Sequence, residues 1–162
     1  MVYYCPHCWK EIPPGTDPCP HCGESTDEAG LTFVERLIRT LCHPEPTRAG
    51  LAIDILAERL REPRAVEPLI ELMSTSKDAA ILRQAARGLG LLGDRRAARP
   101  LATILANLET PLVVSIEAAL ALGRLGADAA ATALRAAFDD RRPSVSRAAQ
   151  QGLAALRQPE AE

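Results

Sequence analysis

The chain contains the segment Ala85-Ala86-Arg87-Gly88-Leu89-Gly90-Leu91-Leu92-Gly93, and 33 residues later it contains Ala118-Ala119-Leu120-Ala121-Leu122-Gly123-Arg124-Leu125-Gly126. A second motif has nearly the same period, because Arg64-Ala65-Val66-Glu67-Pro68-Leu69 returns 32 residues later as Arg96-Ala97-Ala98-Arg99-Pro100-Leu101. Two different motifs that share one period indicate a chain built from repeated structural units.

Each repeated unit is expected to contain two amphipathic helices. Apolar residues recur at positions i, i+3, i+4 and i+7, as in Val34, Leu37, Ile38 and Leu41. The first helices are expected near residues 32–42, 65–75, 97–108 and 129–138. The second helices are expected near residues 46–60, 78–92, 111–125 and 143–157.

Prolines and glycines agree with these helix boundaries. Pro46, Pro111 and Pro143 stand near the starts of second helices, where a missing N–H group costs little. Gly93 and Gly126 stand just past the ends of second helices, where a left-handed conformation is needed. The sequence therefore predicts an all-α helical solenoid of about four helix pairs.

One position of the first helix is predicted to be buried in every unit. Leu69, Leu101 and Leu134 occupy this position in successive units. In the last unit, Arg135 stands where Ala102 stands one unit earlier, and a more polar last unit is expected of a cap.

The N-terminal residues carry two cysteine pairs of the same form. These pairs are Cys5-Pro6-His7-Cys8 and Cys19-Pro20-His21-Cys22, with ten residues between them. Two residues between thiols allow one tight turn to direct both sulfurs at a single ion, and two such turns complete a tetrahedral site. We therefore predict that Cys5, Cys8, Cys19 and Cys22 hold one structural Zn²⁺ ion.

Other uses of these cysteines are weaker. Four thiolates can also hold iron, which is the less favoured metal. A redox dithiol normally lies in a βαβ context that this chain lacks. His7 and His21 are expected to point out of their turns rather than to bind the metal. A site closed by four protein ligands leaves no position for water or substrate.

Two parts of the chain resemble known families. Residues 3–23 resemble the zinc ribbon, whose rubredoxin-type Cys-x2-Cys knuckles match both cysteine pairs, and this implies a small β zinc ribbon with the four cysteines as ligands. Trp9 departs from this pattern, since many such knuckles have glycine there. Residues 32–157 resemble HEAT repeats of the phycobilisome-lyase-like type on the segments 63–69 and 119–126. That resemblance implies a right-handed solenoid, and some members of the family assist bilin attachment in light-harvesting proteins.

Charge and composition suggest how the chain is divided. We expect a zinc ribbon at residues 1–25, a linker at 26–31, a HEAT-like repeat array at 32–158 and a tail at 159–162. Residues 1–30 have a formal net charge of −4, and the remaining residues have +2. No apolar run approaches the roughly 18–20 residues of a transmembrane helix, and no signal peptide is visible, so we expect a cytoplasmic protein without membrane contact.

No pattern of catalytic residues stands out, and the sequence therefore predicts that the chain is not an enzyme. Cys42 and His43 are adjacent, and neighbouring residues on a helix point in different directions. Cys42 extends an apolar face, which predicts a core cysteine. The run Asp139-Asp140-Arg141-Arg142 is interpreted as a solvated turn.

A binding surface is predicted on the second helices, which line the concave face in HEAT repeats. Residues two positions beyond the buried stripe point about 200° away from it, toward solvent. The array is expected to bind a protein partner there as a monomeric, non-catalytic scaffold or adaptor. The predicted partner-binding residues are Asp54, Glu58, Arg83, Arg87, Ile116, Leu120 and Arg124.

Two alternatives to this adaptor remain open. One is a nucleic-acid-binding accessory protein that uses the ribbon and the turn arginines Arg61, Arg64, Arg95 and Arg96. The overall formal charge of −2 makes this the less favoured partner class. The other is a bilin-lyase-like or other enzyme-associated factor.

Overall fold

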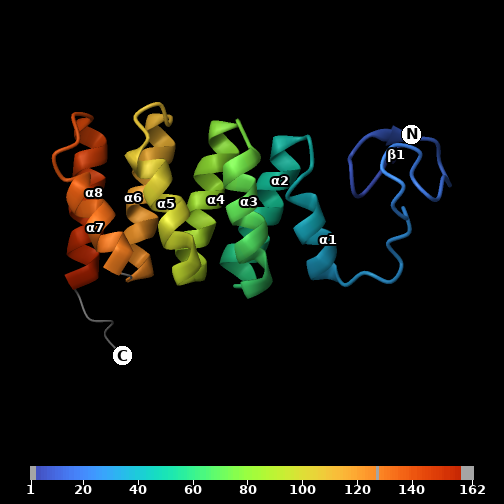
Figure 1. Ribbon diagram of the computed structural model, residues 1–162. Helices are drawn as coiled ribbons and strands as arrows, with labels where there is room; N and C mark the ends of the chain where they lie inside the picture. Colours follow the sequence, from blue (N-terminus) through green and yellow to red (C-terminus); the bar gives the residue numbers. More distant parts are fainter. Residues whose placement is uncertain (1–2, 127, 158–162) are drawn as a thin grey trace.

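The computed structural model describes residues 3–126 and 128–157, and its helices stack side by side into one array (Figure 1). The described residues form eight α-helices, which are α1 (Phe33–Thr40), α2 (Pro46–Asp54), α3 (Val66–Thr75), α4 (Ala79–Leu92), α5 (Ala98–Ala106), α6 (Leu112–Leu125), α7 (Asp128–Ala136) and α8 (Pro143–Arg157). Strands β1 (Tyr3–Tyr4) and β2 (Glu11–Ile12) pair antiparallel near the N-terminus. The predicted helical solenoid with a small β element is confirmed, and the expected tail at 159–162 lies outside the described residues.

The helix ends follow the local chemistry expected from the sequence. Asp78 caps α4, where its carboxylate accepts hydrogen bonds from the N–H groups of Ala80 and Ile81. Gly93 and Gly126 end α4 and α6 with φ of 70° and 64°. This left-handed region favours glycine, so these two predicted helix ends are confirmed.

The second helix of the first unit departs from the prediction of one continuous helix over 46–60. It is α-helical to Asp54 and then widens into a π-helical turn over Ile55–Arg59. The N–H of Leu60 donates to the carbonyl of Ile55, five residues back. Such turns within α-helices occur frequently at functional sites.

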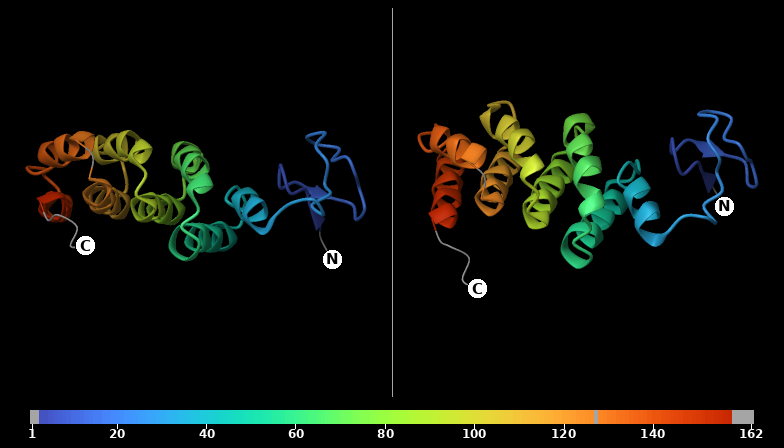
Figure 2. Two further views of the ribbon diagram at one scale, coloured as in Figure 1. Left: turned by 90° about the horizontal axis from the view of Figure 1, so that it is seen from below. Right: turned by 60° about the horizontal axis from the view of Figure 1, so that its bottom comes forward.

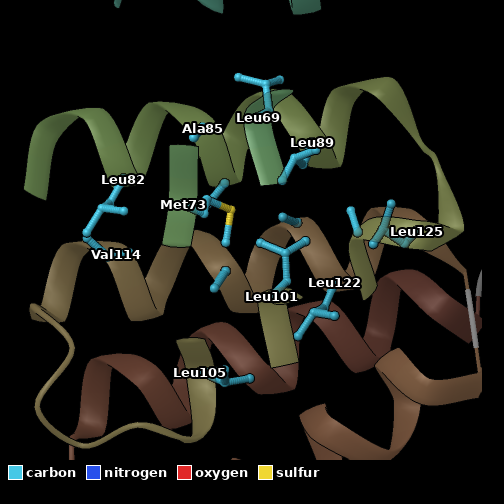
Figure 3. Packing of buried hydrophobic residues seen from close by; sticks show 14 of the residues in the cluster. Leu69, Met73, Leu82, Ala85, Leu89, Leu101, Leu105, Val114, Leu122 and Leu125 are labelled. Atoms are coloured by element: carbon cyan, nitrogen blue, oxygen red, sulfur yellow. The ribbon is translucent and has the colours of Figure 1, made fainter. Parts of the chain in front are cut away.

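The helices lie in two layers, which appear as two rows in the left view of Figure 2. Helices α2, α4, α6 and α8 follow one another in the second-helix layer, and α3, α5 and α7 form the first-helix layer. Figure 3 shows Leu69 and Leu101 from the first helices beside Leu89 and Leu122 from the second helices. All four side chains are fully buried, so the core runs between the layers along the whole array.

Glycines let the second helices approach closely. A Cβ atom on Gly123 of α6 would lie 2.6 Å from the Cα atom of Gly152 in α8. A Cβ atom on Gly90 of α4 would lie 2.8 Å from the Cα atom of Ala121 in α6. These contacts are between backbones, and a larger residue would force the helices apart.

The turn between α7 and α8 is not the solvated turn predicted from its charges. Arg142 forms a two-pronged ion pair with Asp140, and its guanidinium also donates to the Ser115 hydroxyl and the Leu105 carbonyl. The side chains of Asp140 and Arg142 are only 8% and 19% exposed. The pair therefore links the fourth unit to the third, although the adjacent Asp139 and Arg141 are exposed.

Replacing Arg142 by alanine should lower the free energy of unfolding by about 2–3 kcal/mol, because the charged hydrogen bonds are lost and the largely buried Asp140 keeps only the backbone N–H of residue 142 as a hydrogen-bond donor. Hydrogen bonds from Arg142 lower the pKa of Asp140 from its ordinary value of 3.8. The stabilisation is therefore fully present above this value and is lost as the pH falls through the folded-state pKa. Urea unfolding of the variant, with the exposed Arg141→Ala as its control, measures the loss. Equal costs for the two variants would contradict it.

Among the described residues, no helix is both long and apolar enough to cross a membrane.

Candidate metal centre and second-helix face

Two matching turns position the four N-terminal cysteines. The N–H of Cys5 donates to the Lys10 carbonyl, and the N–H of Trp9 donates to the Cys5 carbonyl. In the second turn, the N–H of Cys19 donates to the Glu24 carbonyl, and the N–H of Gly23 donates to the Cys19 carbonyl. The repeated sequence therefore folds into two repeated knuckles, and the β1–β2 pair holds the first of them.

The four sulfur atoms lie within 4.8 Å of one another. The Sγ atoms of Cys5 and Cys22 are 3.7 Å apart, and those of Cys8 and Cys19 are 3.8 Å apart. A tetrahedron with metal–sulfur bonds of about 2.3 Å has edges of about 3.8 Å. The donor set therefore fits one tetrahedral metal ion, and this spacing does not distinguish zinc from iron.

Backbone N–H groups support the thiolates. The N–H of His7 lies 3.4 Å from Cys5 Sγ, and the N–H of His21 lies 3.4 Å from Cys19 Sγ. Burial acts to raise the pKa of Cys19, but hydrogen bonds from His21 and Cys22 N–H groups outweigh it and lower that pKa to about 6. The Glu24 N–H acts to lower the pKa of Cys22, whereas burial and the neighbouring thiols raise it to about 12. A bound cation would offset the repulsion between neighbouring thiolates, and the remaining cysteines could then lose their protons more easily.

The ring of His21 lies beside backbone rather than in the cluster. Its Nε2 is 3.2 Å from the Glu11 carbonyl oxygen. The metal-binding group formed by the described residues contains only the four cysteines. This placement agrees with cysteine-only ligation, which stays a prediction.

Trp9 takes the place that glycine takes in the second knuckle. Its φ is 56°, and the φ of Gly23 is 78°. A bulky residue in this left-handed region is an outlier, so contacts elsewhere must hold it. The Trp9 ring lies 4.4 Å from the ring of His43, which immediately precedes the Pro44–Pro46 segment leading into α2. Trp9 thus connects the cysteine knuckle to the first repeat unit.

Four of the predicted partner-binding residues gather between the first and second units. Arg87 of α4 forms an ion pair with Glu58 of the π-helical turn at 2.7 Å. Burial raises the pKa of Asp54, and the charge of Glu58 acts in the same direction, while Arg87 and Arg83 oppose it. Asp54, Glu58, Arg83 and Arg87 therefore form one charged cluster, whereas the sequence predicted only that each of them points toward solvent.

The remaining predicted residues lie on α6. Ile116 and Leu120 are half-buried and pack against the core instead of standing free in solvent. Arg124 is exposed and lies 3.4 Å from Glu117. Arg124 is thus exposed as expected, whereas Ile116 and Leu120 offer less free surface than the sequence predicted. We call all seven residues the second-helix face.

A groove of about 480 Å³ opens between α2 and α4 beside this charged cluster. Asp54 and Arg83 line it, together with Leu51, whose side chain is largely exposed. Leu51 was not predicted as a site residue. It precedes Asp54 by three positions, one helical turn, and this spacing could have identified it.

Two other sequence interpretations change. The turn arginines Arg64 and Arg96 are engaged by carboxylates, Arg64 by Glu62 and Arg96 by both Asp94 and Glu67. These ion pairs weaken the case for a basic ridge that binds nucleic acid.

Cys42 is exposed rather than a core cysteine, because α1 ends at Thr40 and the chain turns there. No thiol–imidazole pairing is found between it and His43 among the described contacts.

Family comparison agrees with the helical architecture. Residues 33–115 match the family model for HEAT repeats. The chain belongs to the HEAT-repeat family. Residues 116–140 of this HEAT-repeat protein match the model for PBS lyase HEAT-like repeats, as the sequence motifs predicted. No curated protein matches it significantly.

Two solved structures resemble the HEAT-repeat protein, each with 25% sequence identity over 88% of its length. Human deoxyhypusine hydroxylase in complex with glycerol gives a TM-score of 0.65, with 50% of its chain covered. The complex of CpcE and CpcF of phycocyanin lyase from Nostoc sp. PCC7120 gives 0.66, with 58% of that chain covered. The HEAT-repeat protein thus spans half the length of the first structure's chain and 58% of the second's.

These similarities correct one prediction. The expectation that the chain is not an enzyme is contradicted, because a hydroxylase and a lyase complex share its fold and a lyase-type repeat model matches it. The absence of a recognisable catalytic motif led to that expectation. Motif searches test only known local patterns, whereas a site built by a solenoid draws single residues from several units. The comparisons point to an enzyme-related function.

Proposed function

We propose that this HEAT-repeat protein is an enzyme-associated factor that binds a protein on its second-helix face. The observation that carries the proposal is the groove between α2 and α4, where exposed Leu51 lies beside Asp54 and Arg83. An apolar side chain next to charges of both signs suits a protein surface better than a phosphate backbone. The similarity to the CpcE–CpcF complex supports a role next to another protein chain.

The packing of the helices that carry the second-helix face supports the same role. Close backbone contacts at Gly90 and Gly123 limit how far α4, α6 and α8 can move toward one another, so this part of the face keeps its shape against compression when a partner binds. A rigid surface lowers the ordering cost of association. The π-helical turn carries Glu58, and the ion pair between Glu58 and Arg87 joins this turn to α4.

Reversing both charges with Arg83→Glu and Arg87→Glu should weaken partner capture at least tenfold, which corresponds to about 1.4 kcal/mol of binding free energy. A photo-crosslinking residue at Leu51 captures proteins from native extract, and mass spectrometry identifies the adduct. We expect an enzyme subunit or an enzyme's protein substrate. The matched control changes Arg36→Glu and Arg99→Glu, two exposed arginines of first helices, and alters net charge equally.

Three outcomes would contradict this proposal. Capture that survives the double reversal would place the binding surface elsewhere. Equal loss in the matched control would show only a general charge effect. Capture that disappears after nuclease treatment would favour the nucleic-acid-binding alternative.

We further propose that the cysteine cluster holds one Zn²⁺ ion with a structural role, with iron as the less favoured metal. Four protein thiolates close the tetrahedron and leave no open coordination position. The knuckle module is too small to bury a self-sufficient core, so metal binding supplies its folding free energy. We also propose a division into a ribbon at 1–25, a linker at 26–31 and an array at 32–158, and the separate buried clusters of the cysteine module and the helical array support it.

A further inference from the structure

One aromatic contact joins the cysteine module to the repeat array. Figure 1 shows the module at the end of the array where α1 and α2 lie. Trp9 directly follows Cys8 of the cluster, and His43 lies between α1 and the start of α2. The two rings are 4.4 Å apart, so a turn of the metal cluster touches the segment that leads into a helix of the array.

Position 9 of the first knuckle has a backbone conformation that favours glycine. Trp9 and Gly23 close matching turns, and their φ angles of 56° and 78° are both left-handed. This conformation is strained for a tryptophan. The indole N–H of Trp9 is also buried and finds no hydrogen-bond acceptor among the described residues. Packing contacts must offset both costs, and the ring of His43 supplies one of them.

His43 connects this contact to α2. Its Nδ1 accepts a hydrogen bond of 2.9 Å from the Glu45 N–H. Glu45 is the N-cap residue of α2, and its side chain makes no capping hydrogen bond to the helix. The His43 ring therefore supports the backbone at the point where α2 begins.

The start of α2 also borders the groove described above. Pro46, the first residue of α2, lines the groove that contains Leu51 and Asp54. Pro46 also lines a hollow of about 270 Å³ beside His43. A displacement of His43 would therefore be felt at one end of the groove.

We propose that metal binding by the four cysteines docks Trp9 onto His43 and thereby sets the start of α2. This inference rests on the metal centre proposed above and does not depend on the partner of the second-helix face. In the metal-bound chain the ordered first knuckle holds Trp9 in its left-handed conformation. In the metal-free chain the knuckle loosens, the strained backbone of Trp9 relaxes and its ring leaves His43.

Tryptophan fluorescence tests the docking, because Trp9 is the only tryptophan of the chain. Removal of zinc by a chelator under reducing conditions should shift the emission to longer wavelength and increase its quenching by acrylamide. Added zinc should reverse both changes.

His43→Asn separates undocking from unfolding of the knuckle. The asparagine side chain can still accept a hydrogen bond from the Glu45 N–H, two residues on, but it offers no ring to Trp9. This variant should keep one zinc ion per chain and its helix content, yet show increased quenching with zinc bound. The matched control is Phe33→Ala, which removes an exposed aromatic ring of α1 and should leave the quenching unchanged.

Nuclear magnetic resonance of the full chain locates the effect in the array. Zinc removal should shift the amide resonances of residues 42–48 as well as those of the module. In Trp9→Gly, which gives the first knuckle the residue type of the second, zinc removal should shift the module alone. Because coupling between two equilibria is reciprocal, His43→Asn should also raise the dissociation constant for zinc about fivefold.

Three results would overturn the proposal, and they distinguish its two parts. Absence of bound metal by elemental analysis would remove the metal centre and the docking together. Unchanged resonances at residues 42–48 after zinc removal, in a chain shown to hold metal, would remove the docking alone. Wild-type quenching and zinc affinity in His43→Asn would show that Trp9 is held within its own module.

Discussion

Replacing Cys19 by serine should reduce bound metal from one zinc ion per chain to nearly none. Cys19 is buried, and its sulfur lies 3.8 Å from Cys8 Sγ. A serine hydroxyl is a far poorer ligand than a thiolate for a tetrahedral sulfur site. Elemental analysis of protein purified under reducing conditions measures the ratio of metal to protein. Cys42→Ser is the matched control, because Cys42 lies outside the cluster and its loss should leave the metal in place.

The same variant separates the two modules. Without metal the knuckles should unfold, while helix content measured by circular dichroism should stay nearly constant because the array has its own core. Wild-type protein without bound metal would contradict the site, and iron in place of zinc would correct the proposed metal. Equal metal loss in Cys42→Ser would mean that the four-cysteine assignment is wrong.

Leu101→Ala should lower the free energy of unfolding by about 2–5 kcal/mol, the usual cost of deleting a fully buried leucine side chain. Leu101 is 0% exposed and lies between the two helix layers in the middle of the array (Figure 3). Denaturant unfolding measures the change. Thr103→Ala on the same helix is the control, since Thr103 is exposed and should change stability little.

Leu134 tests the packing of the last unit. A polar cap would make Leu134→Ala milder than Leu101→Ala. In the structure Leu134 is also 0% exposed, and its methyl groups lie against Gly152 of α8. We therefore expect a cost in the same range of about 2–5 kcal/mol. A much smaller cost at Leu134 would show that the last unit relaxes around the cavity.

Local patterns were sufficient to predict the helices and the cysteine cluster. The 32- to 33-residue period located both helices of each unit, because one sequence motif marks each helix. The spacing of Cys5, Cys8, Cys19 and Cys22 placed their sulfurs together, because a two-residue gap permits few turn geometries. The position of Trp9 as a substitute for glycine was also visible, and its left-handed backbone agrees with it.

Features that depend on distant partners could not be predicted in this way. The Arg142 contacts reach Ser115 and Leu105, 27 and 37 residues earlier, and a charge run in the sequence carries no trace of them. The π-helical turn lies within a segment whose apolar residues Ile53, Leu56 and Leu60 keep ordinary helical spacing in the sequence, so the spacing gives no sign of the turn. A helical projection treats Leu120 as exposed, whereas the neighbouring helices are close enough to cover part of it.

The glycine contacts between second helices give the array a mechanical asymmetry. At Gly123 and Gly152 the backbones of α6 and α8 already touch, so tighter bending toward the second-helix layer meets hard repulsion. Opening that layer loses only weak, additive attraction between atoms. We therefore expect the array to resist bending unequally in the two directions. It should be stiff when its second-helix layer is compressed and compliant when that layer is stretched.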